Sequence, residues 1–348
     1  MKTYKHLWDQ FISMENFELA ARRAIKSKRN KKSTQNFLQN KDVLLEKLRQ
    51  DLIYDRFQTS KYRTFFVYEP KKREIYELPL YPDHIVHHAL INVLGPIWQK
   101  RFIKDSYACI PGRGVHSAIQ KTMLMVKKNK YVLQCDIRKF YPSINHEIMF
   151  NIIRRKIADK RLLGVLRNII WSCGGETNLP IGNLTSQWMG NVYLNELDYF
   201  VKQQLHCRDY IRYCDDFCLF SNDKRILAQY QERLSQYVRD VLKLEFSKAV
   251  IYPVNRGVTF IGYRHFRKFI MLRKYGAKKL RKRVLNRARY NDTTPLAVGQ
   301  LASYHGWVKW CASYNYLQDI CYRVKHISHN MYDFICTGLM GKKKKKRH

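Results

Sequence analysis

The chain has 348 residues, 45% of them apolar, and a formal net charge of +37 from 65 basic and 28 acidic residues. This excess of positive charge favours a nucleic-acid partner, and no apolar run approaches the roughly 18 residues of a membrane span, which excludes an integral membrane protein. The nine cysteines are scattered without a CxxC pair and we expect no secretory leader, which excludes a disulfide framework or structural zinc site and predicts reduced thiols in a cytosol.

The N-terminal region predicts two helices separated by a basic loop. Apolar residues at helical spacing predict an amphipathic helix over residues 4–26, and the acids within it argue against a transit peptide. KSKRNKKS at 26–33 predicts a loop that is either solvated or in contact with an RNA backbone. Residues 36–57 predict the second helix.

A hairpin is predicted between Lys61 and Leu80, where the apolar period becomes that of strands and EPKK forms the turn. Its tip and far strand carry Lys71, Lys72 and Arg73, and a guanidinium fork suits phosphate oxygens. A helix is predicted over residues 84–102. The PGRG loop that follows would let its backbone approach a ligand closely, and we expect His116 to be a packed residue at a helix start.

A second strand, YVLQCDI at 131–137, carries Asp136 near its end and leads into a basic and aromatic loop with Tyr141. Helices are predicted from about His146 to Ala158 and within residues 160–175. LPIGNLTSQ at 179–187 then opens a long helix, which Asn183 could cap.

The stretch IRYCDDFCLF at 211–220 predicts a hairpin with Asp215 and Asp216 at its tip. Two adjacent carboxylates raise each other's pKa, and a divalent cation would explain their pairing, although a solvated Asp-Asp turn is the alternative when the motif stands alone. Asp136 lies 79 positions earlier at the end of its own strand, and two such strands can supply a two-metal site for phosphoryl transfer. Cys135, Cys214 and Cys218 are interpreted as small core residues.

The C-terminal part of the chain is strongly basic. Residues 224–242 predict a helix, and RGVTFIGYRHF at 256–266 predicts a tight hairpin. From residue 270 onward, 18 Lys and Arg stand against 3 acids, in predicted helices such as KKLRKRVLNRARY and LASYHGWVKWCASYNYL. The run KKKKKR at 342–347 predicts a disordered electrostatic arm.

Three of these motifs, in this order, resemble the palm of a reverse transcriptase: DIRKFYPSI, LPIGNLTSQ and YCDD. The resemblance implies an α/β (α+β) right-hand polymerase with fingers, a palm built on an antiparallel sheet, and a helical thumb. The implied boundaries are an N-terminal helical extension at 1–58, fingers at 59–130, palm at 131–266 with fingers elements near 145–190, thumb at 267–341 and a basic tail at 342–348.

The same resemblance implies RNA-templated DNA synthesis with two Mg²⁺ ions, from dNTPs on a template RNA. Asp136, Asp215 and Asp216 would hold the metals, and Lys248 matches a lysine proposed to protonate pyrophosphate. Tyr141 would exclude a 2′-hydroxyl from the incoming nucleotide. The other implied contacts are with the nucleotide at Arg73, Lys71, Ile181, Gly182 and Gln187, with the primer at Phe260, Gly262 and Tyr263, and with template RNA at Arg113, Lys279, Arg281 and Arg283.

Most reverse transcriptases have Gln-Gly where this chain has Ile181-Gly182, and Ser-Pro where it has Ser186-Gln187. This pattern resembles the reverse transcriptases of diversity-generating retroelements, which implies error-prone cDNA mutated opposite template adenines to diversify a target gene. It also implies a small basic accessory protein that forms a ring, in a prokaryotic or phage-encoded cytosol. Two alternatives stay open: a retron-like or group II intron-like enzyme of ordinary fidelity, and a catalytically inactive RNA-binding scaffold.

Overall fold

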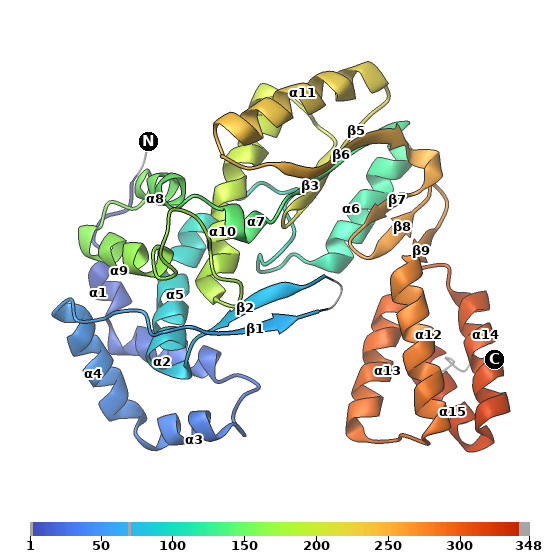
Figure 1. The fold of residues 1–348 in the computed structure, drawn as a ribbon, viewed down its shortest axis with the longest axis horizontal. Helices are drawn as coiled ribbons and strands as arrows, with labels where there is room; N and C mark the ends of the chain where they lie inside the picture. Colours follow the sequence, from blue (N-terminus) through green and yellow to red (C-terminus); the bar gives the residue numbers. More distant parts are fainter. Residues whose placement is uncertain (1–2, 69–70, 341–348) are drawn as a thin grey trace, which may run out of the picture. The chain divides into compact units, whose positions relative to one another are not determined.

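The computed structural model describes residues 3–68 and 71–340, and the predicted basic arm at 342–347 therefore lies outside the described residues. The chain folds into two compact units (Figure 1). The first comprises the chain up to Val115 together with Leu133–Leu219 and Arg225–Val250. The second comprises His116–Val132, Phe220–Lys224 and the chain from Ile251 onward, so both units draw on separated stretches of sequence.

Four helices form the N-terminal region: α1 Trp8–Phe11, α2 Met14–Ala24, α3 Lys32–Gln39 and α4 Lys41–Ile53. The predictions of single helices over 4–26 and 36–57 are therefore wrong. The first breaks because the Ser13 side chain accepts a hydrogen bond from the Asn16 amide and starts a new helix. The second breaks at Asn40, which has a non-helical backbone.

The hairpin predicted between Lys61 and Leu80 is present. Strands β1 Arg63–Val67 and β2 Arg73–Glu77 pair antiparallel, with Val67 opposite Arg73. A short π-helical turn, η1 Leu80–His84, leads into α5 Ile85–Gln99, which is buried along most of its length.

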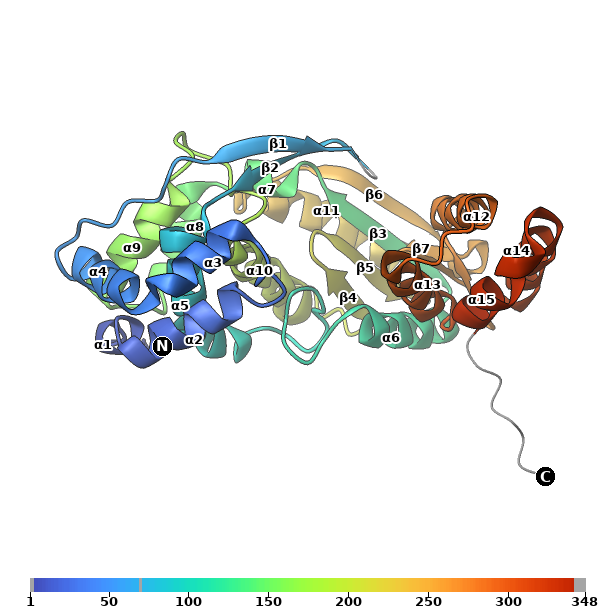
Figure 2. The ribbon, with the colours of Figure 1, turned by 90° about the horizontal axis from the view of Figure 1, so that it is seen from below.

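Four strands form a sheet in the order β4-β5-β3-β6, and Figure 2 shows them side by side. Their bounds are β3 Tyr131–Ile137, β4 Tyr210–Tyr213, β5 Asp216–Ser221 and β6 Phe246–Pro253. The interiors of β3, β4 and β5 are buried on both faces, which explains why their sequences are mostly apolar; Gln134 and Arg212 are buried polar exceptions.

Helices connect these strands. They are α7 Phe140–Ser143, α8 His146–Arg154, α9 Lys160–Ile170, α10 Leu184–Tyr199 with its π-helical extension η2 Phe200–Gln204, and α11 Lys224–Asp240. Asn183 occupies the N-cap position of α10, but its side chain does not cap the helix. Its amide nitrogen instead donates to the Tyr62 hydroxyl at 2.8 Å, so the capping prediction is wrong.

The second unit contains α6 Val115–Lys128, the short helix η3 Val254–Arg256, and a sheet of β7 Val258–Phe260, β8 Tyr263–His265 and β9 Ile270–Leu272. Four helices follow: α12 Lys274–Arg289, α13 Pro295–Val308, α14 Tyr314–Ile327 and α15 His329–Met340. LASYHGWVKWCASYNYL spans two of them, because the chain turns at 309–313, where the Ser313 hydroxyl donates to the Val308 carbonyl. The apolar core of these helices includes Leu280, Val284, Leu301, Ile320, Val324, Ile335 and Leu339.

The prediction of a mixed helix-and-sheet fold is confirmed. Across residues 3–68 and 71–340, no helix combines the length and the apolar character needed to cross a bilayer.

Candidate active site

The predicted Asp-Asp hairpin is formed by β4 and β5, with Tyr213 paired to Asp216. Cys214 and Asp215 make the two-residue turn, and Cys214 adopts a left-handed backbone with φ of 55°. Tight hairpin turns of this kind require positive φ. The turn thus presents Asp215, while Asp216 is the first residue of β5 rather than part of the tip.

Asp136 lies on β3, the strand next to β5. The Ser247 hydroxyl on β6 donates to its carboxylate. Burial raises the pKa of Asp216 to about 7; a hydrogen bond from Gln134 opposes the shift, and the negative charges of Asp136 and Asp215 add to it. The pKa of Asp215 is also raised, mainly by burial and further by Asp136. The three carboxylates therefore form one electrostatically coupled cluster.

This cluster has the chemistry of a site for hard divalent cations, because carboxylate oxygens are the ligands such ions prefer and a cation would relieve the repulsion among the acids. Within the part of the chain that the structure describes, no three His, Cys, Asp or Glu side chains are grouped so as to hold a metal ion by themselves. In phosphoryl-transfer enzymes, water and substrate phosphates complete the coordination sphere. The acids fit that arrangement, in which bound cations activate the attacking hydroxyl and stabilise the charge that develops at phosphorus.

Two cations of the β1–β2 hairpin act on the same cluster. The charges of Arg73 and Lys71 lower the pKa of Asp215 against the effect of burial, so both lie within electrostatic reach of it. Both side chains are exposed. Lys72 is directed differently, because its Nζ lies 4.3 Å from the centroid of the Phe66 ring.

Tyr141 follows β3 on the short helix α7, and burial raises the pKa of its hydroxyl, which keeps it neutral. Its ring lies against Gly190 of α10. A Cβ atom at Gly190 would come within 3.3 Å of Tyr141 Cε1 and 3.2 Å of Phe140 Cε1. Gly190 thus sets the place of the ring, a role that sequence reasoning missed although a glycine inside a helix is an available signal.

The segment Ile181-Gly182 pairs with the hairpin. The Tyr76 amide on β2 donates to the Ile181 carbonyl at 2.8 Å. Gly182 has φ of 135°, and a Cβ atom there would lie 2.2 Å from the Tyr76 carbonyl oxygen. The close backbone approach predicted at Gly182 is therefore to β2. Gln187 is exposed in the first turn of α10.

Lys248 lies on β6, and its Nζ donates to Gln134 Oε1 at 2.7 Å. The other end of the same amide donates to Asp216 Oδ1 at 3.5 Å. Gln134 was not singled out from the sequence, although it stands two residues before Asp136 and so on the same face of β3.

Arg113 lies on the loop before α6, and its guanidinium donates to the backbone carbonyls of Ile103 and Ser106, at 2.9 Å for Ser106. These bonds hold the loop itself. Contact with template RNA stays a prediction for Arg113, and it would use the donors that remain.

The predicted primer-binding residues belong to the second unit. Gly262, with φ of 81°, lies in the β7–β8 turn. Phe260 is buried, and the Tyr263 hydroxyl donates to the Trp307 carbonyl at 3.1 Å. Both side chains are thus part of the packing of this unit, and the Gly262 carbonyl accepts a hydrogen bond from the Arg273 amide at 3.0 Å.

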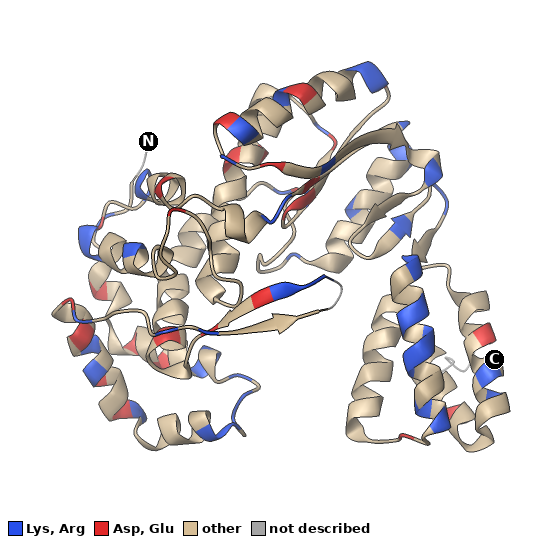
Figure 3. Cartoon of the chain, viewed as in Figure 1, with Lys and Arg blue, Asp and Glu red and all other residues tan. Residues whose placement is uncertain are grey.

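The predicted template-binding residues Lys279, Arg281 and Arg283 are all on α12, along which the Lys and Arg positions, blue in Figure 3, follow one another. Arg281 forms an ion pair with Asp319 at 3.7 Å, and Arg283 donates to the Tyr304 hydroxyl at 3.5 Å. α12 thus combines an apolar side that packs in the helical core with a basic side.

Residues 71–265, more than half of the chain, match the family model described as reverse transcriptase (RNA-dependent DNA polymerase). The chain belongs to the reverse transcriptase family. The prediction of an RNA-directed DNA polymerase with a right-hand polymerase fold is thereby confirmed, and the family implies dependence on divalent metal and binding of template RNA.

Curated relatives include protein YkfC of Escherichia coli, 26% identical over 276 residues, which are 65% of this chain and 72% of the relative. The retron Ec73 reverse transcriptase of Escherichia coli is 32% identical over 168 residues, covering 44% of this chain and 52% of the relative. The group II intron-encoded protein LtrA of Lactococcus lactis is 22% identical over 294 residues, covering 62% and 48%. The chain thus spans about half the length of the last two of these relatives.

Among solved structures, this reverse transcriptase is similar to a telomerase from Candida albicans, with a TM-score of 0.46 and 10% identity over 82% of this chain and 62% of that one.

Proposed function

We propose that this chain copies an RNA template into DNA with two Mg²⁺ ions held principally by Asp136 and Asp215, with Asp216 in support. The observation that carries the proposal is the coupled cluster of three carboxylates, which the charges of Arg73 and Lys71 reach from the fingers hairpin. Negative groups that bind metal thus lie near cations suited to a triphosphate.

Within this proposal, Arg73 and Lys71 align the triphosphate. Arg73 is the first residue of β2 and Lys71 lies two residues before it, and both are exposed and act electrostatically on Asp215. Tyr141 forms the floor under the sugar, where its ring leaves no space for a 2′-hydroxyl. Gly190 supports this role by admitting the ring close to α10.

Lys248 is proposed as the group that protonates the departing pyrophosphate. Its hydrogen bond to Gln134 holds the ammonium on the side of Asp216. This bond supports the placement of Lys248 beside the acids, and the proton transfer itself is a proposal.

The proposed domains follow the boundaries implied by the sequence: an extension at 1–58, fingers at 59–130, palm at 131–266, thumb at 267–341 and a basic tail at 342–348. Within the second unit, the β7–β8 turn with Gly262 would hold the primer end. The basic side of α12, with Lys279, Arg281 and Arg283, would contact the backbone of the template duplex.

The test is primer extension by the purified full chain on an RNA template with a DNA primer, in Mg²⁺ and with dNTPs. We expect DNA synthesis that is lost in Asp215→Asn, while both proteins retain binding to the template and primer. Binding without synthesis in the wild-type protein, under any choice of divalent metal, would instead support the inactive RNA-binding scaffold.

We further propose that the enzyme belongs to the diversity-generating retroelement subfamily, makes adenine-mutagenised cDNA and works with a small basic accessory protein that forms a ring. Ile181 and Gln187 support this, because isoleucine lacks the amide that could hold template and nucleotide, and glutamine is less rigid than proline at a helix start. Ile181 is placed on the segment bonded to β2 of the fingers hairpin. A loss of about 1.4 kcal/mol in geometric enforcement would reduce base selectivity roughly tenfold.

Sequencing of cDNA made on one RNA separates this proposal from an enzyme of ordinary fidelity. We expect errors concentrated opposite template adenines, and fewer such errors in Ile181→Gln combined with Gln187→Pro. A flat error spectrum in the presence of the native RNA and accessory protein would favour the retron-like or group II intron-like alternative, which the 32% identity to the retron Ec73 enzyme keeps in view.

A further inference from the structure

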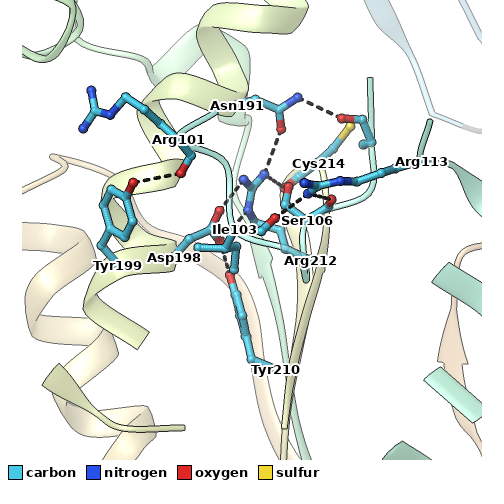
Figure 4. Close-up of polar contacts among 11 residues, drawn as sticks. Arg101, Ile103, Ser106, Arg113, Asn191, Asp198, Tyr199, Tyr210, Arg212 and Cys214 are labelled. Atoms are coloured by element: carbon cyan, nitrogen blue, oxygen red, sulfur yellow. Dashed lines mark hydrogen bonds and ion pairs between the residues drawn. The ribbon is translucent and has the colours of Figure 1, made fainter. Parts of the chain in front are cut away.

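A buried ionic network lies behind the catalytic turn, outside the residues assigned above (Figure 4). Arg212 is the third residue of β4, and both it and Asp198 of α10 are completely buried. The guanidinium meets the carboxylate through two parallel bonds, Nε to Oδ1 at 2.8 Å and the second terminal nitrogen to Oδ2 at 2.6 Å. The Tyr210 hydroxyl also donates to Asp198 Oδ1, at 2.7 Å.

The remaining terminal nitrogen of Arg212 reaches the catalytic turn. It donates to the carbonyl of Cys214 at 3.0 Å and to Asn191 Oδ1 at 3.1 Å. Asn191 stands seven residues before Asp198, which places both on one face of α10, and its amide nitrogen donates to the Ala108 carbonyl at 2.8 Å. One side chain therefore ties α10 to the turn that presents Asp215.

The backbone of Arg212 is fixed as well. Its amide donates to the Asp105 carbonyl at 2.9 Å, and its carbonyl accepts from the Tyr107 amide at 3.1 Å. Arg212 is thus held at both its backbone and its guanidinium. One of its hydrogen bonds goes to the carbonyl of Cys214, the residue with a left-handed backbone conformation.

Stability alone does not explain such an ion pair, because apolar residues of similar volume often serve a core equally well. A left-handed conformation is unfavourable for a residue with a Cβ atom and persists only where its surroundings impose it. A bond to the Cys214 carbonyl fixes the peptide plane between Cys214 and Asp215, and hence the direction in which the Asp215 side chain leaves the backbone. Only arginine offers donors in enough directions to bind Asp198, Asn191 and this carbonyl together.

We infer that Arg212 is a positioning residue for DNA synthesis, which holds the Cys214–Asp215 turn in the conformation that aims the Asp215 carboxylate. The inference rests on the proposed function of Asp215. The restraint that Arg212 places on the turn does not depend on which reaction the protein catalyses.

The experiment compares Arg212→Lys with Tyr210→Phe in the full chain. Lysine keeps a positive charge beside Asp198 but lacks the fork that reaches the turn. Phenylalanine removes one bond to Asp198 from the same buried cluster and leaves every bond to the turn in place. The readouts are steady-state primer extension, which gives kcat and KM for dNTP, and hydrogen exchange of the peptide spanning residues 211–218.

In Arg212→Lys we expect kcat to fall about 100-fold, the size of effect produced by a misplacement of roughly 1 Å at a reacting centre, with KM for dNTP unchanged. We expect exchange in the turn to be about tenfold faster, as one lost hydrogen bond allows. Tyr210→Phe should unfold at a lower temperature and keep wild-type kcat and exchange. Wild-type values in Arg212→Lys, or equal losses in both variants, would overturn the inference.

Asn191→Ala is the second test, and it decides the matter if Arg212→Lys does not fold. It removes one acceptor from the guanidinium and the bond to the Ala108 carbonyl, while leaving the ion pair intact. With its terminal nitrogen less restrained, Arg212 should hold the turn less firmly, so kcat should fall by a smaller factor and the turn should exchange faster. Wild-type behaviour of a folded Asn191→Ala would also overturn the inference. A wild-type protein that makes no DNA would refute the proposed function, and the exchange measurements would still report on the turn.

Discussion

At the scale of single residues, the site combines acids that differ in their surroundings. Asp216 accepts a hydrogen bond from the Gln134 amide, and its pKa is raised to about 7. Asp136 instead accepts a hydrogen bond from the Ser247 hydroxyl. A cation would relieve the repulsion among the three acids, and we expect metal affinity to depend most on Asp136 and Asp215, the proposed principal ligands.

We expect Asp136→Asn and Asp215→Asn each to reduce DNA synthesis by about 10³-fold or more, because each removes a charge that neutralises metal while keeping the shape of the side chain. Asp216→Asn should reduce synthesis less, since Asp216 begins β5 and is proposed only to support the metals. Primer extension in Mg²⁺ measures all three. Wild-type activity in Asp215→Asn would remove the basis of the proposed site.

A second residue-scale prediction concerns His87, which is completely buried in α5 with its Nδ1 3.4 Å from the Thr185 hydroxyl. The pKa of His87 is lowered to about 3, mainly by burial and to a smaller extent by the charges of the nearby His84 and His88. The unfolded chain therefore binds the proton first, and stability should fall as pH drops from about 6.5 towards 3. At pH 5 the loss would be about 2 kcal/mol from this residue.

Urea unfolding at pH 7 and pH 5 checks this. His87→Asn should reduce the difference between the two midpoints, because asparagine does not titrate. His206→Asn is the matched control, since His206 is exposed in the same unit, and it should leave the difference unchanged. An equal effect of the two substitutions would contradict the prediction.

The acids could be identified from sequence because adjacent carboxylates at a strand break are chemically conspicuous. Arg212 and Gln134 could not, because their roles depend on partners on other elements: Asp198 and Cys214 for Arg212, and Lys248 and Asp216 for Gln134. A glycine inside a helix made Gly190 noticeable in the sequence, but its partner, the ring of Tyr141, was not. Asn183 shows the same limit, since its side-chain nitrogen donates to the hydroxyl of Tyr62 on a distant segment and its side-chain oxygen accepts no bond from the start of the helix.

At the scale of elements, strands and hairpins followed the sequence more closely than helices did. β-Period and turn residues located β1–β2, β4–β5 and β7–β8. Helix ends were missed where a single polar residue interrupts an apolar pattern that continues on both sides, as at Ser13 and Asn40. The spacing of apolar residues indicates which face of a helix is buried, but it does not indicate where one helix ends and the next begins in a new direction.

The junction between β2 and the start of α10 supports a prediction about Gly182. Gly182→Ala would place a methyl group 2.2 Å from the Tyr76 carbonyl oxygen on a backbone with φ of 135°, so the hairpin must shift. We expect a loss of more than about 2 kcal/mol in stability and a raised KM for dNTP, because Arg73 moves with β2.

Gly174→Ala is the matched control. Gly174 has φ of 70° and no heavy atom within 4 Å of an added Cβ, so only backbone strain of about 1 kcal/mol is expected, without a change in KM. Thermal unfolding and steady-state kinetics measure both variants. Equal KM values in the two would show that the junction does not position the nucleotide.

At the scale of the whole molecule, the charge of +37 predicts RNA binding that weakens steeply with salt. The logarithm of the binding constant should fall against the logarithm of salt with a slope near −0.7 per neutralised phosphate for single strands and −0.9 for a B-form duplex. Removing residues 342–348, or replacing three of the basic residues of α12 with alanine, should make the slope shallower. The replaced residues are Lys279, Arg281 and Arg283.

The control removes the same charge from exposed positions of the first unit, Lys5, Lys47 and Lys160. Fluorescence anisotropy of a labelled RNA gives the slopes. If α12 contacts the nucleic acid, the salt-dependence slope should become shallower in its variant than in the control. Equal slopes in the α12 variant and the control variant would show that these charges act only through the net charge of the protein.

The strand order β4-β5-β3-β6 also has a consequence for synthesis of the chain on the ribosome. Asp136 lies on an interior strand whose two neighbours, β5 and β6, begin at Asp216 and Phe246 and so emerge much later. Until then the nascent β3 has both edges unpaired, and such edges are prone to wrong partners. A nascent chain arrested before β6 should therefore remain dependent on chaperones, however complete its N-terminal helices are.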